Sequence, residues 1–165
     1  MAAIRETRLI ISPPTQEILN LIHIAAMDIW NDVNAATEIP LTALPPRESC
    51  KEIQREFRNN HQRLVRHGNS SAAAQILDPA RVDVNGWVPQ IFVMFEGSFG
   101  MPPGTVAVAI PIIKEMDPLI EYYCEGQVVT VDWKIGAMIY MQGDSSLASD
   151  GCGKTAFIFF LFKMK

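Results

Sequence analysis

The amino-acid sequence predicts an α+β fold in which two N-terminal helices pack on a mainly antiparallel sheet of five to seven strands. Three observations lead to this class. Apolar residues recur with helical spacing in the first 68 residues, strand-like apolar runs dominate after residue 80, and no helical segment separates those runs. Strands that follow one another directly pair antiparallel, so a parallel nucleotide-binding sheet is excluded.

The length and composition are those of one compact, intracellular domain. The 165 residues suit a single domain, with a strand and two helices in residues 1–68 and antiparallel strands in residues 80–165. Apolar residues make up 48% and charged residues only 19%, which excludes general disorder and indicates that part of the apolar surface meets a partner. Residues 1–12 contain no export signal, and no uncharged apolar run could span a membrane, so we expect a cytoplasmic location.

The N-terminal third predicts a strand, a helix and a linker. Residues 4–12 alternate and then become apolar, as in a strand. The Ser-Pro-Pro-Thr sequence at 12–15 is a helix start, and residues 15–34 carry apolar side chains around most of the helix, which predicts a largely buried core filler. Residues 37–46 contain three prolines and are expected to form an extended linker.

A second helix, residues 46–67, carries the only basic segment of the chain. Residues 47–67 hold six basic and three acidic side chains, whereas the whole chain has a net charge of −4. This segment predicts contact with a polyanion, either RNA or anionic lipid, because arginine forks suit phosphate geometry. The candidate residues are Lys51, Arg55, Arg58, Arg63 and Arg66. The alternative is a solvated helix face on which Glu48, Glu52 and Glu56 neutralise several of these charges.

The strands expected after residue 80 lie at 81–84, 87–88, 90–96, 105–113, 119–124, 127–133, 135–142 and 155–162. Asn85-Gly86 and Glu125-Gly126 are two-residue hairpin turns. The last strand is apolar on both faces, so it is either a central strand or an edge that pairs with another copy.

Two loops are candidate sites. Phe99 and Met101 occupy a Gly- and Pro-rich loop whose tip inserts into a membrane or a neighbouring subunit, or else folds back on its own sheet. Residues 148–155 resemble a phosphate-binding loop in which Lys154 and Thr155 would contact phosphate and magnesium. That mechanism needs a helix to begin at Lys154, and a Phe-rich strand follows instead, so a glycine-rich hairpin loop is favoured.

No other chemical constellation emerges. His23, His61 and His67 lack metal-ligand spacing, so no metal is expected. Cys50, Cys124 and Cys152 are an odd number without paired spacing, which excludes a disulfide scaffold, and none lies in a catalytic signature. We therefore predict no catalytic residue and no cofactor.

These observations favour a non-enzymatic structural or assembly protein that self-associates and contacts an anionic partner through its basic helix. A viral matrix-like or nucleocapsid-associated protein would have this composition, and other protein subunits are further candidate partners. The alternative is a small-molecule enzyme or ligand-binding domain, with a pocket between helix 15–34 and the sheet and residues 143–154 as its lid.

Overall fold

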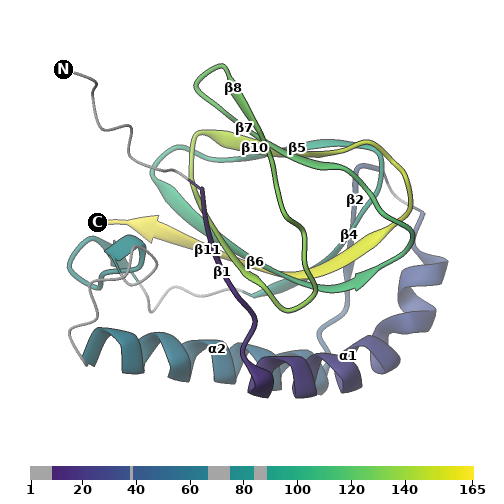
Figure 1. Ribbon diagram of the computed structural model, residues 1–165, viewed down its shortest axis with the longest axis horizontal. Coiled ribbons are helices and arrows are strands. Elements are labelled where there is room, and N and C mark those ends of the chain that lie inside the picture. The colour runs from purple at the N-terminus through teal and green to yellow at the C-terminus, as the bar shows by residue number, and fades with distance from the viewer. Residues whose placement is uncertain (1–8, 38, 67–74, 84–88) are drawn as a thin grey trace.

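The computed structural model describes residues 9–37, 39–66, 75–83 and 89–165 of the chain. They form three layers: two helices, a seven-stranded sheet on which the helices lie, and a four-stranded sheet on its far side (Figure 1). The α+β prediction is confirmed. The single predicted sheet is wrong, because the chain divides its strands between two sheets.

Both sheets are antiparallel throughout. The larger sheet has the order β1 (Leu9–Ser12), β9 (Met138–Gln142), β6 (Thr105–Lys114), β11 (Thr155–Met164), β4 (Gln90–Met94) and β2 (Leu41–Leu44), and β3 (Val82–Asp83) also pairs with β11. The smaller sheet has the order β5 (Gly97–Met101), β10 (Ser145–Ser149), β7 (Ile120–Cys124) and β8 (Gln127–Thr130).

From β4 to β11 the chain passes repeatedly from one sheet to the other. The larger sheet takes β4, β6, β9 and β11, while the smaller one takes β5, β7, β8 and β10. This winding closes the two sheets face to face as a jelly-roll barrel. The predicted turn at Glu125-Gly126 is confirmed, since both residues have positive φ and join β7 to β8.

The larger sheet is buried on both faces because helices cover one side and the smaller sheet the other. β11 shows this by its alternation: Ile158 and Phe160 join the core beneath the helices, while Phe157 and Phe159 join the core inside the barrel. Of the two predictions for this strand, the central one is confirmed, because β6 and β4 flank it.

The first helix, α1 (Gln16–Ala35), is less buried than the sequence predicts. Thr15 caps its N-terminus by accepting a hydrogen bond from the Ile18 amide at 3.2 Å. Only one face is buried on the sheet, and it consists of Ile18, Ile22, Ala25, Ile29 and Val33. Trp30, expected in the core, is half exposed because it lies on the outer side of the helix.

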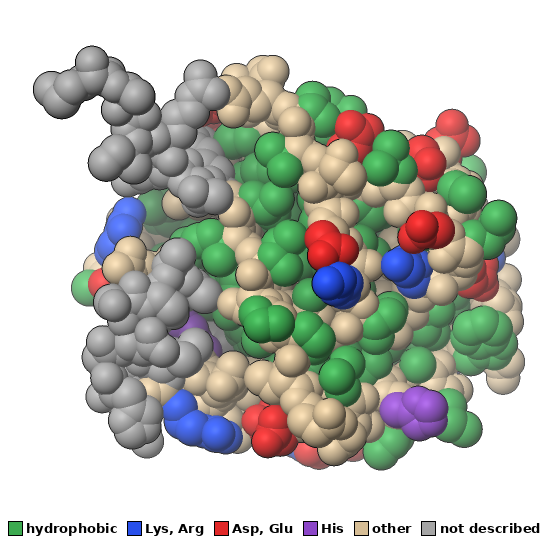
Figure 2. Space-filling model, viewed as in Figure 1, with side chains coloured by type: hydrophobic (Ala, Val, Ile, Leu, Met, Phe, Trp, Pro, Cys, Tyr) green, Lys and Arg blue, Asp and Glu red, His purple; other side chains and the backbone are tan. Residues whose placement is uncertain are grey.

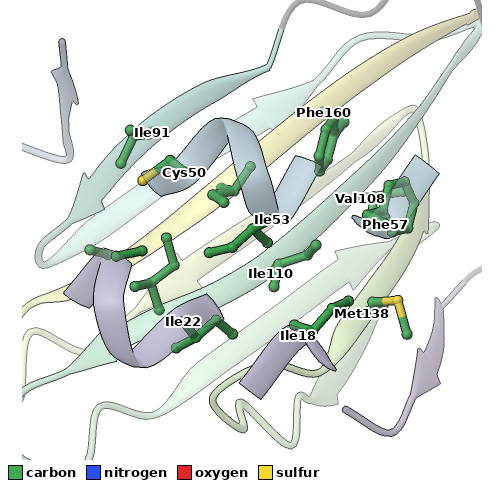
Figure 3. Close-up of a cluster of buried hydrophobic side chains, with 14 of the residues drawn as sticks. Ile18, Ile22, Cys50, Ile53, Phe57, Ile91, Val108, Ile110, Met138 and Phe160 are labelled. Carbon is green, nitrogen blue, oxygen red and sulfur yellow. The ribbon is translucent and has the colours of Figure 1, made fainter. Parts of the chain in front are cut away.

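The second helix, α2 (Glu48–Arg66), follows β2, which occupies part of the segment expected to be a linker. Its apolar line is confirmed at Cys50, Ile53 and Phe57, which pack on the sheet beside α1 (Figure 3). Neither α1 nor α2 has an apolar stretch long enough to cross a membrane. The hairpin expected at Asn85-Gly86 lies outside the described residues.

Candidate functional site

A cavity of about 380 Å³ opens where the start of α2 meets the β2 edge of the larger sheet. Its apolar wall comes from β2, β4 and the segments that precede α2 and β4, and its polar groups come mainly from α2. The lining residues are Ala43, Leu44, Pro46, Arg47, Cys50, Lys51, Gln54, Pro89, Gln90 and Ile91. Figure 3 shows Cys50 of α2 and Ile91 of β4 at this margin of the helix-side core.

Arg47 is the polar residue most tightly built into this cavity wall. Its Nη2 donates a hydrogen bond to Asp32 Oδ2 of α1 at 2.6 Å, and Asp32 raises the pKa of the guanidinium by this hydrogen bond and by its charge. The Nε of Arg47 is buried and has no hydrogen-bond partner among the described residues. A buried donor without an acceptor loses its hydration without compensation. The Arg47 side chain as a whole is 39% exposed, so the rest of its guanidinium can be reached from the cavity.

The neighbouring residues supply a second cation and an inert thiol. Lys51 is half exposed, and its ammonium lies 3.8 Å from the Glu48 carboxylate. Burial raises the pKa of the Cys50 thiol to about 11, so this sulfur stays protonated near neutral pH and is not a nucleophile. The wall therefore combines apolar surface, two cations and a neutral thiol.

The basic residues predicted to bind a polyanion are largely neutralised within α2. Arg55 pairs with Glu48 at 2.9 Å and also with Glu52, and Arg63 lies 3.7 Å from Glu56. Arg58 also has an interaction partner, and nothing is described of the Arg66 side chain. These pairs are three or seven residues apart, which places both partners on one side of the helix, so the basic segment is a mixed-charge helix face.

Lys154 and Thr155, the candidate phosphate-loop residues, form hydrogen bonds within the protein to other elements of the fold. The Lys154 ammonium donates to the carbonyls of Val33, Asn34 and Ala36 at 3.1–3.2 Å, and so binds the C-terminus of α1. Thr155 Oγ1 donates to Ile113 O at 2.9 Å and accepts from the Trp133 indole at 2.8 Å. Thr155 begins strand β11, so the helix that a phosphate loop requires is not there.

The glycines of this loop allow close packing of the backbone. A Cβ at Gly153 would overlap the carbonyl of Glu115, and the residue has a φ of +96°. Glycine is therefore required where two chain segments touch, which accounts for a Gly-rich sequence without any phosphate.

The loop expected to expose Phe99 and Met101 is strand β5. Met101 is buried, and the Phe99 ring stacks on Phe157 at 6.2 Å and meets Phe159 edge-on at 5.8 Å. The expectation of an exposed tip is wrong because the Gly and Pro residues after Met101 make the turn, while β5 itself pairs with β10.

The pocket and lid of the small-molecule prediction are also misplaced. The space between α1 and the sheet is filled by the buried face of the helix. Residues Ser145–Ser149 of the expected lid form β10, which lies between β5 and β7. The cavity lies beside α2 instead. Its location could not be predicted because the three prolines of residues 37–46 indicated a linker, whereas Leu41–Leu44 form strand β2.

The barrel interior is an aromatic and aliphatic core. Trp133 meets Phe157 edge-on at 5.4 Å, and the inward residues of β5 and β10 are Phe99, Met101 and Leu147. Within the described part of the chain, no three His, Cys, Asp or Glu side chains gather as a metal site. The two described histidines, His23 and His61, both lie on the helices, outside the barrel.

No protein-family model and no curated protein sequence matches the chain. Its fold nevertheless resembles solved structures at very low sequence identity. A prolyl-4-hydroxylase of Pseudomonas putida has a TM-score of 0.63 at 8% identity, covering 96% of this chain and 93% of that one. A prolyl hydroxylase of Trichoplax adhaerens, solved with a peptide fragment, has a TM-score of 0.61 at 8% identity, with 94% and 83% covered.

A viral collagen prolyl hydroxylase of Paramecium Bursaria Chlorella virus-1, solved as a 2OG complex, has a TM-score of 0.54 at 9% identity, covering 96% of this chain and 97% of that one. At such identities the likeness shows the fold alone. The prediction of a matrix-like or RNA-binding assembly protein, made from composition and the basic helix, is wrong, because the solved structures that share this fold are prolyl hydroxylases.

Non-haem iron oxygenases, as a chemical class, hold the metal with two histidines and one carboxylate. The described residues do not fit such a centre, since the barrel core consists of apolar and aromatic side chains and no three His, Cys, Asp or Glu side chains gather among the described residues. The chain shares the barrel fold of hydroxylases, and the described part of its barrel lacks the ligand set of a non-haem iron centre.

Proposed function

We propose that the chain is a ligand-binding domain on a jelly-roll barrel, and that it binds a small carboxylate with an apolar body in the cavity between α2, β2 and β4. The observation that carries this proposal is the partly exposed Arg47 side chain in the cavity wall, with Lys51 as a second cation beside it. The planar guanidinium matches the geometry of a carboxylate.

The size and lining of the cavity support this ligand class. At roughly 30 Å³ per water, 380 Å³ is the volume of about twelve waters, which suits a molecule of about ten non-hydrogen atoms. Leu44 and Ile91 offer apolar contact, and Lys51 provides a second positive charge near the entrance. Small-molecule sites commonly combine an apolar wall with a few polar groups in this way.

The test is calorimetric titration of the full chain with straight-chain carboxylates of four to ten carbons, alongside the corresponding primary amides. We expect saturable binding of one carboxylate near octanoate and much weaker binding of its amide. Arg47→Lys keeps a positive charge for Asp32 and removes the planar guanidinium, so it should weaken carboxylate binding at least about tenfold, the loss of one charge-assisted hydrogen bond.

The matched control is Arg63→Lys, because Arg63 is an exposed arginine of the same helix outside the cavity. It should bind the carboxylate as the parent chain does. Gln54→Trp places an indole in the cavity, so it should also weaken carboxylate binding, by occupying the space of the ligand. Absence of saturable binding by every carboxylate, or equal affinity in Arg47→Lys and Arg63→Lys, would refute the proposal.

A further inference from the structure

The outward face of α1 exposes three large apolar side chains. Ile24, Met27 and Trp30 are 62%, 75% and 48% exposed, and they follow one another at intervals of three residues. A surface helix normally turns polar residues to water, so this row is unusual for a helix whose opposite face is already packed on a sheet. In Figure 2 the lower right edge of the molecule, where α1 lies, carries hydrophobic side chains around a histidine.

This face also lacks fixed charge. With about 100° of rotation per residue, the side chains within about 60° of Met27 include no Lys, Arg, Asp or Glu. They are Gln16, Asn20, His23, Ile24, Met27, Trp30, Asn31 and Asn34. The acidic residues Asp28 and Asp32 are instead turned to α2, where Asp28 accepts from the Ser49 hydroxyl at 2.6 Å and Asp32 pairs with Arg47.

We propose that this face of α1 binds the same face of a second copy, with the two helices antiparallel and Met27 at the two-fold axis. The row is symmetric about Met27, so Ile24 of each copy meets Trp30 of the other. Because the face carries no fixed charge, two copies meet without like-charge repulsion, and antiparallel helices oppose their dipoles favourably. A two-fold contact of this kind is closed and gives a dimer rather than an open assembly.

The size of the surface sets the expected strength. A helix of 20 residues is about 30 Å long, and a contact along one such face falls at the lower end of specific protein interfaces. We therefore expect a reversible dimer in the micromolar range. Loss of the Met27 contact should be enough to make the chain monomeric.

The test is sedimentation velocity of the full chain from about 5 to 500 μM, a range that spans micromolar dissociation. The parent chain should shift from monomer to dimer as concentration rises. Met27→Glu places two carboxylates at the axis, so it should raise the dissociation constant at least about a hundredfold and stay largely monomeric across this range. Mixing Met27→Glu with Met27→Lys should restore a dimer that neither variant forms alone, because opposite charges then face each other.

The matched control is Met116→Glu, since Met116 is 76% exposed and lies outside α1. It should dimerise as the parent chain does, and both variants should keep the parent melting temperature because both methionines face solvent. A parent chain that stays monomeric at 500 μM overturns the proposal. If Met116→Glu loses the dimer as Met27→Glu does, the contact is not made by this face of α1. If the mixture of Met27→Glu and Met27→Lys does not dimerise, the two Met27 residues do not meet at a two-fold axis.

Discussion

His61 is a buried, neutral imidazole on α2. Its Nε2 lies 3.0 Å from Leu77 O, its ring stacks on Phe57, and its Nδ1 is buried without a partner among the described residues. Burial lowers the pKa of His61 below the ordinary value of 6.5, and the hydrogen bond to Leu77 only partly opposes this effect. The neutral tautomer that donates from Nε2 satisfies Leu77 O, whereas the protonated ring would bury a charge.

The pH dependence of stability follows from this pKa. The unfolded chain binds the proton at a higher pH than the folded chain, so the contribution of His61 to the free energy of unfolding is complete above about pH 6.5 and is lost as the pH falls. His61→Gln cannot titrate and should show a flatter curve between pH 7 and pH 5 in urea unfolding. Parallel curves for the parent and His61→Gln would contradict this assignment.

At the scale of elements, Lys154 connects the start of β11 to the end of α1. Its ammonium donates to three carbonyls of that helix end and lies 5.0 Å from the centre of the Phe95 ring. The last turn of α1 has no basic residue of its own, so Lys154 supplies the positive charge that a helix C-terminus favours.

Lys154→Met should therefore lower the free energy of unfolding by about 1–3 kcal/mol, since it removes a charged donor from three carbonyls, two of them partly buried. Lys134→Met is the matched control, because Lys134 is exposed and pairs only with Asp132 in the described structure. It should change stability by less than about 0.5 kcal/mol. Denaturant unfolding measures both, and equal effects would contradict the capping role of Lys154.

Individual elements could be predicted where a local pattern decides the structure. The apolar run at 105–113 predicted strand β6, and the turn at Glu125-Gly126 predicted the β7–β8 hairpin. Both predictions succeeded because each depends on residues that are close together in the sequence. Strand β10 was missed because Ser145–Ser149 has only one large apolar residue, Leu147, and its place depends on pairing with β5 and β7. β5 was missed for a similar reason, since Phe99 and Met101 alternate with glycine and serine, which are typical of loops.

At the scale of the whole molecule, the division of strands between two sheets could not be predicted from the sequence. Antiparallel order is local, but whether β5 stays beside β4 or crosses to another sheet depends on contacts between distant residues such as Phe99 and Phe157. The cavity was missed for the same reason, because its lining comes from residues 43–54 and residues 89–91, which are far apart in the sequence. The charge pairing of α2, by contrast, was predicted as the alternative to polyanion binding, and the pairs of Arg55 with Glu48 and of Arg63 with Glu56 agree with it.

The two cores of the molecule share strand β11, and this predicts one cooperative unfolding transition. Phe160 packs beneath the helices against Phe57 at 5.0 Å, and Phe157 packs inside the barrel against Trp133. Each ring is fully buried, so Phe160→Ala and Phe157→Ala should each cost about 3–5 kcal/mol. Because neighbouring residues of one strand alternate between the cores, the loss of either ring should destabilise both.

The measurement compares helical circular dichroism with the fluorescence of Trp133 in a Trp30→Phe, Trp87→Phe background. The midpoints of the two signals should coincide in the parent and should move together in both alanine variants. A Phe157→Ala chain whose barrel signal is lost while its helices keep the parent midpoint would mean that the cores unfold separately. Coincidence would show that β11, by contributing alternate residues to each core, couples the helices to the barrel.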